Sequence, residues 1–306
     1  MPQVLVTGAN GFAGAAVCRH LMRRGWTLRG SVRRRDATVP QDVDQVVSGP
    51  LDGETDWRAA LQDVEAVVHC AARVHVLRET APDPLTAFRV VNVSASRRLA
   101  AQAAAAGVRR FVFLSSVGAA VAEAELNHAT PYQRSKLEAE QALQEAVTGS
   151  AMVLVMLRPP LVYGPGAPGN FAQLARLVAA GWPLPLASLT NRRAQLFVGN
   201  LTGAVEAALA CTASPPAALP LCDGEDLSAG ELARRIGRAC GRPARLLPCP
   251  PALLRLAGRW LGRGAAVAAL TRSLPVSNAE ITAALGWEPS YSIDQGLDLT
   301  FSETAP

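Results

Sequence analysis

Thr7-Gly8-Ala9-Asn10-Gly11-Phe12-Ala13-Gly14 contains three glycines spaced three residues apart, directly after an apolar run. A turn between a strand and a helix needs positions that tolerate a positive φ or the absence of a side chain. Such a turn lets the backbone approach a pyrophosphate, to which the helix presents its N–H groups and positive dipole end. The stretch therefore predicts a dinucleotide-binding turn, and the alternative is a glycine-rich turn without a ligand.

Outward from this turn, strand and helix patterns alternate along the first half of the chain. Apolar runs predict strands at residues 4–7, 27–32, 45–47, 66–70, 111–114 and 152–157. Apolar residues at helical spacing predict helices at residues 12–22, 55–62, 85–106 and 132–147. Strands that alternate with helices build a parallel sheet covered on both faces, so we expect an α/β fold with a Rossmann-type doubly wound sheet.

The alternation breaks after residue 158, because proline and glycine crowd positions 159–169. We expect a dinucleotide-binding domain at 1–158 and a smaller C-terminal α/β substrate lobe at 159–306, whose contributions can interleave. Helices are predicted there at 171–180, 201–211, 228–240, 252–261 and 278–285, with short strands near Leu196 and Leu246. The fourth of these helices is amphipathic, and packing against neighbouring helices is favoured over contact with a membrane for Leu253, Leu254, Leu256 and Trp260.

Composition places the chain among globular proteins, because 49% apolar and 18% charged residues exclude disorder and a coiled coil. The net charge of +5 comes from arginines spread along the chain, which suits an anionic ligand and predicts no nucleic-acid partner. The six cysteines show no metal-binding spacing, so reduced thiols and no metal site are expected. No signal-type leader and no membrane-length apolar run are recognised, which predicts a cytoplasmic location without a membrane span.

The spacing T-G-x-x-G-x-x-G resembles the extended branch of the short-chain dehydrogenase/reductase superfamily, the NAD-dependent epimerase/dehydratase family, which acts largely on nucleotide sugars. His69-Cys70-Ala71-Ala72 looks like the family's H-x-A-A segment, and Arg158-Pro159-Pro160-Leu161-Val162-Tyr163-Gly164-Pro165-Gly166 is similar to the segment after its sixth strand. Leu285-Gly286-Trp287-Glu288-Pro289 resembles its closing signature. The resemblance covers essentially the whole chain and is strongest to the bacterial UDP-glucose 4-epimerase-like group, which includes UDP-N-acetyl-quinovosamine-forming 4-reductases.

The end of the second predicted strand bears on the cofactor. NAD-using members carry an acidic residue there, whereas this chain has Val32 followed by Arg33, whose guanidinium can pair with a 2′-phosphate. NADP(H) is therefore favoured and NAD(H) is the alternative; Arg33 could also belong to a solvated basic turn. Pro50 replaces the family's acidic residue near the adenine, with Asp52 close by. The resemblance implies further cofactor contacts from Gly8, Asn10, Gly11, Phe12, Gly14, Ala71, Ala72, Asn92, Pro159, Leu161 and Val162.

Tyr132 and Lys136 form Y-x-x-x-K, which places both on one face of a helix, and Ser116 follows the fifth predicted strand. A phenol with a pKa of about 10 is a poor base at neutral pH, and a neighbouring ammonium and an oxidised nicotinamide favour its phenolate. The resemblance implies that Tyr132 is the general acid/base. It also implies that Lys136 lowers the tyrosine pKa and binds the nicotinamide ribose, while Ser116 hydrogen-bonds the reacting oxygen. A solvated surface pair is the alternative.

Substrate contacts are implied for Ser116, Asn170 and Arg193, with Arg272 as a second arginine for the diphosphate; solvated arginines are the alternative. Between Ser116 and Tyr132 the chain lacks the family's Asn-Gly or Tyr-Gly pair. A shortened loop is therefore expected at 117–131, with an altered sugar pocket.

Hydride transfer at C4 of a UDP-sugar is the reaction that the resemblance implies. Arg33 favours NADPH-dependent reduction of UDP-2-acetamido-2,6-dideoxy-hexos-4-ulose, as in surface-polysaccharide biosynthesis. A UDP-hexose 4-epimerase with tightly bound NAD is the alternative on the same fold, and a non-catalytic dinucleotide sensor is a further one. A homodimer is also expected.

Overall fold

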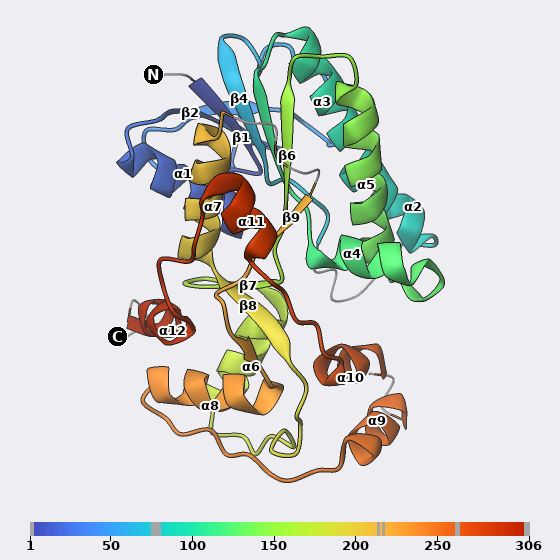
Figure 1. Cartoon of the computed structure of the whole chain (residues 1–306), viewed down its shortest axis with the longest axis vertical. Coiled ribbons are helices and arrows are strands. Elements are labelled where there is room, and N and C mark those ends of the chain that lie inside the picture. Colours follow the sequence, from blue (N-terminus) through green and yellow to red (C-terminus); the bar gives the residue numbers. More distant parts are fainter. Residues whose placement is uncertain (1–2, 75–80, 213–214, 216–217, 261–263, 303–306) are drawn as a thin grey trace. The chain divides into compact units, whose positions relative to one another are not determined.

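The computed structural model describes residues 3–74, 81–212, 215, 218–260 and 264–302. Its main feature is a seven-stranded sheet in the order β3-β2-β1-β4-β5-β6-β9, in which every neighbouring pair is parallel (Figure 1). The strands are β1 (Gln3–Thr7), β2 (Thr27–Val32), β3 (Asp44–Val47), β4 (Val64–His69), β5 (Arg110–Leu114), β6 (Val153–Arg158) and β9 (Ala218–Pro220). The predicted Rossmann-type sheet is confirmed, with its strand order reversing between β1 and β4.

Helices flank this sheet and close its core. They are α1 (Phe12–Arg23), α2 (Pro84–Arg89), α3 (Ala95–Ala105), α4 (Val117–Ala124), α5 (Pro131–Val147), α7 (Val198–Ala210) and α11 (Ala279–Leu285). The single helix predicted at 85–106 is α2, a π-helical turn at Val90–Ser94, and α3 in direct succession. Leu99 of α3 and Leu143 of α5 are fully buried against Phe111 of β5, so these two helices are held to the sheet by apolar packing.

The helix predicted at 55–62 is wrong, because these residues form turns. Gln102 of α3 binds the backbone at the start of this segment. Its Oε1 accepts from the Trp57 N–H (2.7 Å), and its amide donates to the Thr55 carbonyl (3.1 Å). Trp57 is fully buried, so the segment is fixed by tertiary contacts, and Asp63 with φ at 60° turns the chain into β4.

Residues 117–131, expected as a shortened loop, are largely helical. α4 occupies Val117–Ala124, and a 3₁₀ turn follows at Leu126–His128. The sequence VGAAVAEA is rich in the residue with the highest helix propensity, and Ser116 caps its first turn by accepting from the Gly118 N–H (3.0 Å). The chain therefore continues from β5 into a helix at the predicted catalytic serine.

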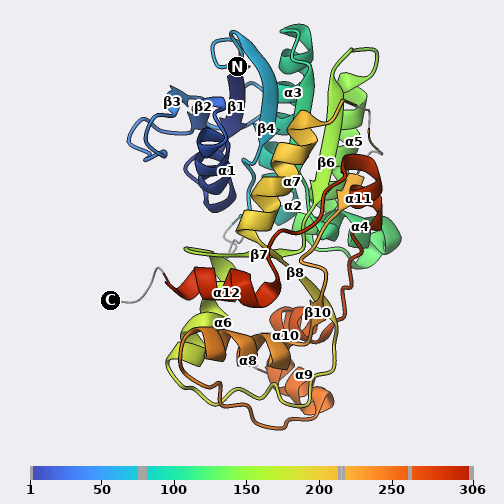
Figure 2. The same ribbon diagram turned by 60° about the vertical axis from the view of Figure 1, so that its left-hand side comes forward.

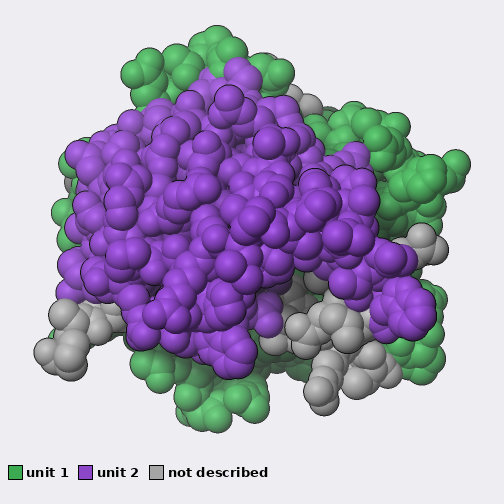
Figure 3. Space-filling view, turned by 90° about the horizontal axis from the view of Figure 1, so that it is seen from below, with its two compact units in different colours: residues 1–159, 201–221, 279–288 green, residues 160–200, 222–278, 289–306 purple. Residues whose placement is uncertain are grey.

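The chain divides into two compact units, coloured separately in Figure 3. Unit 1 comprises residues 1–159, 201–221 and 279–288, and unit 2 comprises 160–200, 222–278 and 289–306. The segment 201–221, which the sequence-based boundary assigns to the C-terminal lobe, belongs to unit 1 because β9 pairs with β6.

Unit 2 contains a second, three-stranded sheet in the order β10-β8-β7, which can be followed in Figure 2. β7 runs parallel to β8, and β10 runs antiparallel to it. The elements are β7 (Leu161–Tyr163), β8 (Arg193–Phe197), β10 (Asp226–Leu227), α6 (Gly169–Ala179), α8 (Ala229–Ala239), α9 (Pro251–Trp260), α10 (Gly264–Thr271) and α12 (Ile293–Ser302). The last residue of the helix predicted at 252–261 lies outside the described residues.

Candidate functional site

The glycine turn joins the carboxyl end of β1 to α1. Gly8 has φ at +65°, and a Cβ there would lie 3.0 Å from Cα of Ala71, which follows the neighbouring strand β4. A Cβ on Gly14 would lie 2.1 Å from the Gly8 carbonyl oxygen, so only glycine lets α1 approach the turn this closely. No described side chain caps the N-terminus of α1, whose N-cap residue is Gly11. This backbone cradle at the reversal of strand order fits a dinucleotide pyrophosphate.

A buried histidine ties the ends of β1 and β4 together. The Ala71 N–H donates to Thr7 Oγ1 (3.2 Å), and Thr7 Oγ1 lies 2.7 Å from His69 Nδ1. On the other side, His69 Nε2 lies 2.8 Å from Ser96 Oγ, whose hydroxyl donates to the Asn92 carbonyl (2.7 Å). Because that hydroxyl proton is used, His69 donates from Nε2 and accepts at Nδ1. Burial, assisted by Lys136, lowers the pKa of His69 to about 3, so the ring is neutral.

Asn92 lies in the π-helical turn and is 1% exposed. Its Oδ1 accepts from the Arg73 N–H (2.7 Å), and its amide donates to the Arg73 carbonyl (3.2 Å) and to Ser135 Oγ (2.9 Å). Ser135 in turn donates to the Tyr132 carbonyl (2.8 Å). Asn92 therefore links the loop after β4 to the start of α5. π-Helical turns are rare and occur frequently at functional sites.

Arg33 is exposed directly after β2, whereas Val32 before it is 2% exposed. The Ala9 N–H of the glycine turn donates to the Ser31 carbonyl (3.2 Å), so this strand end and the glycine turn share one edge of the sheet. Asp52 uses its carboxylate within its own turn, where Oδ1 accepts from the Glu54 N–H (2.9 Å). Its predicted contact with adenine stays a prediction.

Tyr132 and Ser116 come together from α5 and from the start of α4. Burial raises the pKa of the Tyr132 phenol, and a hydrogen bond from Ser116 opposes that rise. Because Ser116 Oγ accepts from the Gly118 N–H, its hydroxyl proton is available for donation. The two side chains therefore lie near each other, and their catalytic roles stay predictions. Phe88 lies edge-on to the tyrosine ring with centroids 6.0 Å apart.

Lys136 lies one turn after Tyr132 and is 2% exposed. Its Nζ donates to the Leu114 carbonyl (2.7 Å) and lies 4.6 Å from the centroid of the Phe113 ring. Burial lowers the pKa of Lys136 to about 8, while the charge of Glu140 opposes the shift. The ammonium has three N–H donors, of which the Leu114 carbonyl takes one.

Glu140 is a site residue that the motif search missed. It is 3% exposed and accepts from Arg158 Nε at Oε1 (3.0 Å) and from Arg158 Nη2 at Oε2 (2.6 Å). The hydroxyl of Ser115, next to Ser116, also donates to it. The spacing of four residues places Tyr132, Lys136 and Glu140 on one helix face, but it does not show that the carboxylate is buried.

The residues predicted after the sixth strand lie in both units. The Pro159 carbonyl in unit 1 accepts from the Val117 N–H (3.0 Å) at the start of α4. In unit 2, Leu161 and Val162 form β7, and Asn170 is exposed in the first turn of α6. Their contacts with cofactor or substrate stay predictions.

The two predicted substrate arginines meet within unit 2. Arg193, at the start of β8, donates from Nη1 to the Arg272 carbonyl (3.3 Å). Burial, with the nearby Arg272 charge, lowers the pKa of Arg193. The Arg193 side chain is thus bound to the backbone of Arg272, and the contacts of both arginines with a substrate diphosphate stay predictions.

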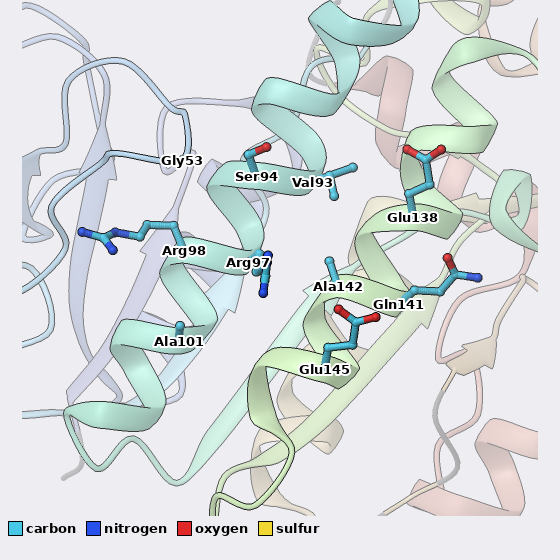
Figure 4. A pocket seen from close by; sticks show the side chains of 10 residues that line it. All are labelled: Gly53, Val93, Ser94, Arg97, Arg98, Ala101, Glu138, Gln141, Ala142 and Glu145. Atoms are coloured by element: carbon cyan, nitrogen blue, oxygen red, sulfur yellow. The ribbon is translucent and has the colours of Figure 1, made fainter.

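A groove of about 600 Å³ lies between α3 and α5 of unit 1. Figure 4 shows that Arg97 and Arg98 of α3 contribute to its wall, as do Glu138 and Glu145 of α5. None of Ser116, Tyr132 and Lys136 lines it. Its mixed charge makes it a poor site for an anionic ligand, and it is separate from the predicted catalytic residues.

Within the described residues no group of three or more His, Cys, Asp or Glu is arranged to hold a metal ion. No described helix has the length and apolarity to cross a membrane. The six cysteines form no disulfide, and all of them lie in the described part of the chain.

A profile of the NAD dependent epimerase/dehydratase family matches residues 4–218. A UDP-glucose 4-epimerase from Vibrio cholerae is 36% identical over 316 residues, covering 98% of this chain and 95% of that protein. The structure of a UDP-glucose 4-epimerase from Thermotoga maritima, with UDP-glucose, has a TM-score of 0.77 at 21% identity over 99% of both chains. A UDP-glucose 4-epimerase from Thermus thermophilus, in complex with NAD, has a TM-score of 0.76 at 25% identity over 98% of both chains.

The solved structures bear on the fold, and the profile and the Vibrio relative bear on the family. The predicted fold, the predicted family and the prediction of an NAD-dependent enzyme of that family are all confirmed. The chain belongs to the NAD dependent epimerase/dehydratase family.

Proposed function

We propose that this protein is an NADP(H)-linked oxidoreductase that reduces the C4 ketone of a UDP-sugar. The observation that carries the choice of cofactor is the end of β2, where buried Val32 offers no carboxylate and exposed Arg33 supplies a positive charge beside the glycine turn. A guanidinium favours a 2′-phosphate, whereas an NAD site places an acid at this edge. The substrate we propose is UDP-2-acetamido-2,6-dideoxy-hexos-4-ulose, in surface-polysaccharide biosynthesis, as the sequence resemblance implies.

The chain's own residues account for the proton. A bound NADPH would supply the hydride for C4. Tyr132 transfers its phenolic proton to O4, so that the ketone becomes an alcohol and the tyrosine becomes a phenolate. Ser116 is fixed by the Gly118 N–H and directs its hydroxyl proton toward the same oxygen. The Lys136 ammonium stabilises the phenolate until a proton from solvent restores it.

Burial raises the pKa of Tyr132, which keeps the phenol in the acid form that reduction of a ketone uses.

A second candidate function is 4-epimerisation of a UDP-hexose with tightly bound NAD. The observation that favours it is the Vibrio cholerae relative described as a UDP-glucose 4-epimerase, at 36% identity over nearly the whole chain. An epimerase retains its cofactor through oxidation and reduction of the same C4, whereas a reductase exchanges cofactor in every turnover.

One experiment separates the two candidates. The purified protein is denatured to release any bound nucleotide, and the native protein is assayed with UDP-4-keto sugar plus NADPH and, separately, with UDP-glucose alone. Ketone reduction that depends on added NADPH is expected. Retained NAD⁺ together with interconversion of UDP-hexoses without added cofactor would establish the epimerase instead. Cofactor binding with no turnover, unchanged in Tyr132→Phe, would identify a dinucleotide sensor.

The cofactor assignment has its own test at Arg33. A charge-assisted hydrogen bond contributes about 1.5–3 kcal/mol, so Arg33→Ala should weaken NADPH binding by about 10- to 100-fold and leave NADH binding nearly unchanged. Arg34→Ala is the matched control, because Arg34 forms an exposed ion pair with Asp36 (3.4 Å). Val32→Asp with Arg33→Asn should shift preference toward NAD(H). Equal losses for both cofactors in Arg33→Ala would show that Arg33 supports the turn rather than binding phosphate.

The oligomeric state and the location are separate proposals. We propose a homodimer in the cytoplasm, on the strength of the family resemblance. Sedimentation equilibrium of the full chain measures the first, and cell fractionation measures the second.

A further inference from the structure

A long segment, which lies in unit 2 except for its last residue, contains no acidic residue. The segment 232–279 contains nine arginines and no aspartate, glutamate or lysine. Its formal charge is +9, whereas the whole chain carries +5, so the remaining residues together carry −4. Two of these arginines, Arg235 and Arg238, form ion pairs with Glu225 and Asp294, which lie outside the segment. Helices α9 and α10 lie within this segment.

Helix α9 presents an apolar stripe to solvent. Leu253, Leu256 and Trp260 stand at positions i, i+3 and i+7 and are 57%, 53% and 85% exposed. Gly258 is buried and Leu254 is half-buried on the other side of the helix, and α10 is the main packing partner of α9 among the described elements. The two helices lie next to each other in Figure 2. The expected packing against neighbouring helices is therefore wrong for Leu253, Leu256 and Trp260, and it holds only for the side of α9 that carries Leu254.

We propose that the stripe Leu253–Leu256–Trp260 docks on the surface of an anionic phospholipid bilayer. Tryptophan and leucine on one face with arginines elsewhere on the helix is the composition of helices that lie in the membrane interface. The exposed Arg255 of α9 is attracted to anionic headgroups. At ten residues α9 is too short to span a bilayer, so it lies in the plane of the interface.

A second copy of the chain is the other occupant that an apolar stripe suggests, and charge argues against it. Two copies packed stripe to stripe would bring together two copies of the segment 242–278, which has six arginines and no acidic residue or lysine, and like charges in contact repel. An anionic bilayer instead offers charge of the opposite sign over a wide area. The proposal goes beyond the reaction proposed above and does not depend on it, because the stripe contains none of the residues assigned to catalysis.

The full-length protein is tested by co-sedimentation with vesicles of phosphatidylglycerol and phosphatidylcholine, and with vesicles of phosphatidylcholine alone. We expect binding to the anionic vesicles that falls as salt increases, and little binding to the neutral ones. Leu253→Gln with Leu256→Gln and Trp260→Gln should weaken binding by about tenfold or more, since several apolar side chains leave the interface. Arg255→Glu should weaken it by about fivefold or more.

Trp182→Gln is the matched control, because Trp182 is a tryptophan of unit 2 that is 62% exposed outside the 232–279 segment, and its variant should bind like the unchanged protein. Circular dichroism and NADPH binding verify that each variant is folded. On the unchanged protein, brominated lipid should quench tryptophan fluorescence, and Trp260→Phe should abolish most of that quenching while keeping the binding.

Three results would overturn the proposal. The first is that the unchanged protein does not bind anionic vesicles, and the second is that the stripe variant binds them normally. The third is that the stripe variant converts a dimer into a monomer in the absence of lipid, which would make the stripe a contact between copies of the chain.

Discussion

Replacing Glu140 by glutamine tests whether the network behind the catalytic residues holds the site together. Glu140 is 3% exposed, and the Arg158 side chain that it binds at 3.0 and 2.6 Å is 15% exposed. Glutamine keeps the size and one acceptor oxygen but removes the charge, so the guanidinium is left with Glu123, which is 61% exposed at 3.2 Å. Removing one partner of a buried ion pair destabilises a protein by about 3–5 kcal/mol.

We expect the lower end of that range, about 3 kcal/mol, because the glutamine oxygen still accepts one hydrogen bond from Arg158. For a cooperatively unfolding unit of about 150–250 residues, a loss of about 3 kcal/mol lowers the melting temperature by roughly 6–12 °C. The assay is thermal and urea unfolding followed by circular dichroism. The matched control is Glu138→Gln on the same helix, whose pair with Arg89 is solvent-exposed, and which should change stability by about 1 kcal/mol at most.

A double variant separates the ion pair from simple packing. Glu140→Gln combined with Arg158→Met removes both charges, so its destabilisation should be smaller than the sum of the two single changes. The buried ion pair does not stabilise the site if the free energy of unfolding of Glu140→Gln lies within about 1 kcal/mol of that of the unchanged protein, as expected for Glu138→Gln.

Three further predictions concern catalysis and the cofactor turn. Tyr132→Phe and Lys136→Met should each lower kcat by about 10²-fold or more in steady-state assays, with Ser116→Ala losing less, and normal activity in Lys136→Met would contradict the Y-x-x-x-K assignment. The catalytic rate should fall as pH rises through about 8, where Lys136 loses its proton. Glu140→Gln should shift this fall in rate to lower pH, because the Glu140 charge no longer raises the pKa of Lys136. An unshifted pH profile would show that Glu140 does not influence the pKa of Lys136. Gly14→Ala should abolish nucleotide binding measured by calorimetry, since its Cβ would lie 2.1 Å from the Gly8 carbonyl oxygen. An unchanged affinity would show that nucleotide binding does not require the close approach of α1 to the turn.

The sequence by itself determined the features that depend on neighbouring residues. The positive φ at Gly8 and the close approach at Gly14 are requirements of a few adjacent positions, so the strand, turn and helix of the glycine motif were predictable. The alternation of β1, α1 and β2 follows from periodicities of two and 3.6 residues, which are local as well. For the same reason the four-residue spacing placed Tyr132 and Lys136 on one face of α5.

Contacts between side chains and backbone groups that are distant in the sequence could not be predicted without the tertiary structure. Gln102 of α3 captures the backbone at Thr55 and Trp57, and no local signal shows that this long-range pair replaces a helix. Glu140 and Arg158 likewise acquire their importance from burial, which depends on the packing of α5 against the sheet. In α9 the period of the apolar residues was visible in the sequence, but an amphipathic pattern does not reveal whether another element covers it. That depends on which surfaces the rest of the chain leaves open, because burial is a property of the assembled fold and periodicity is a property of one segment.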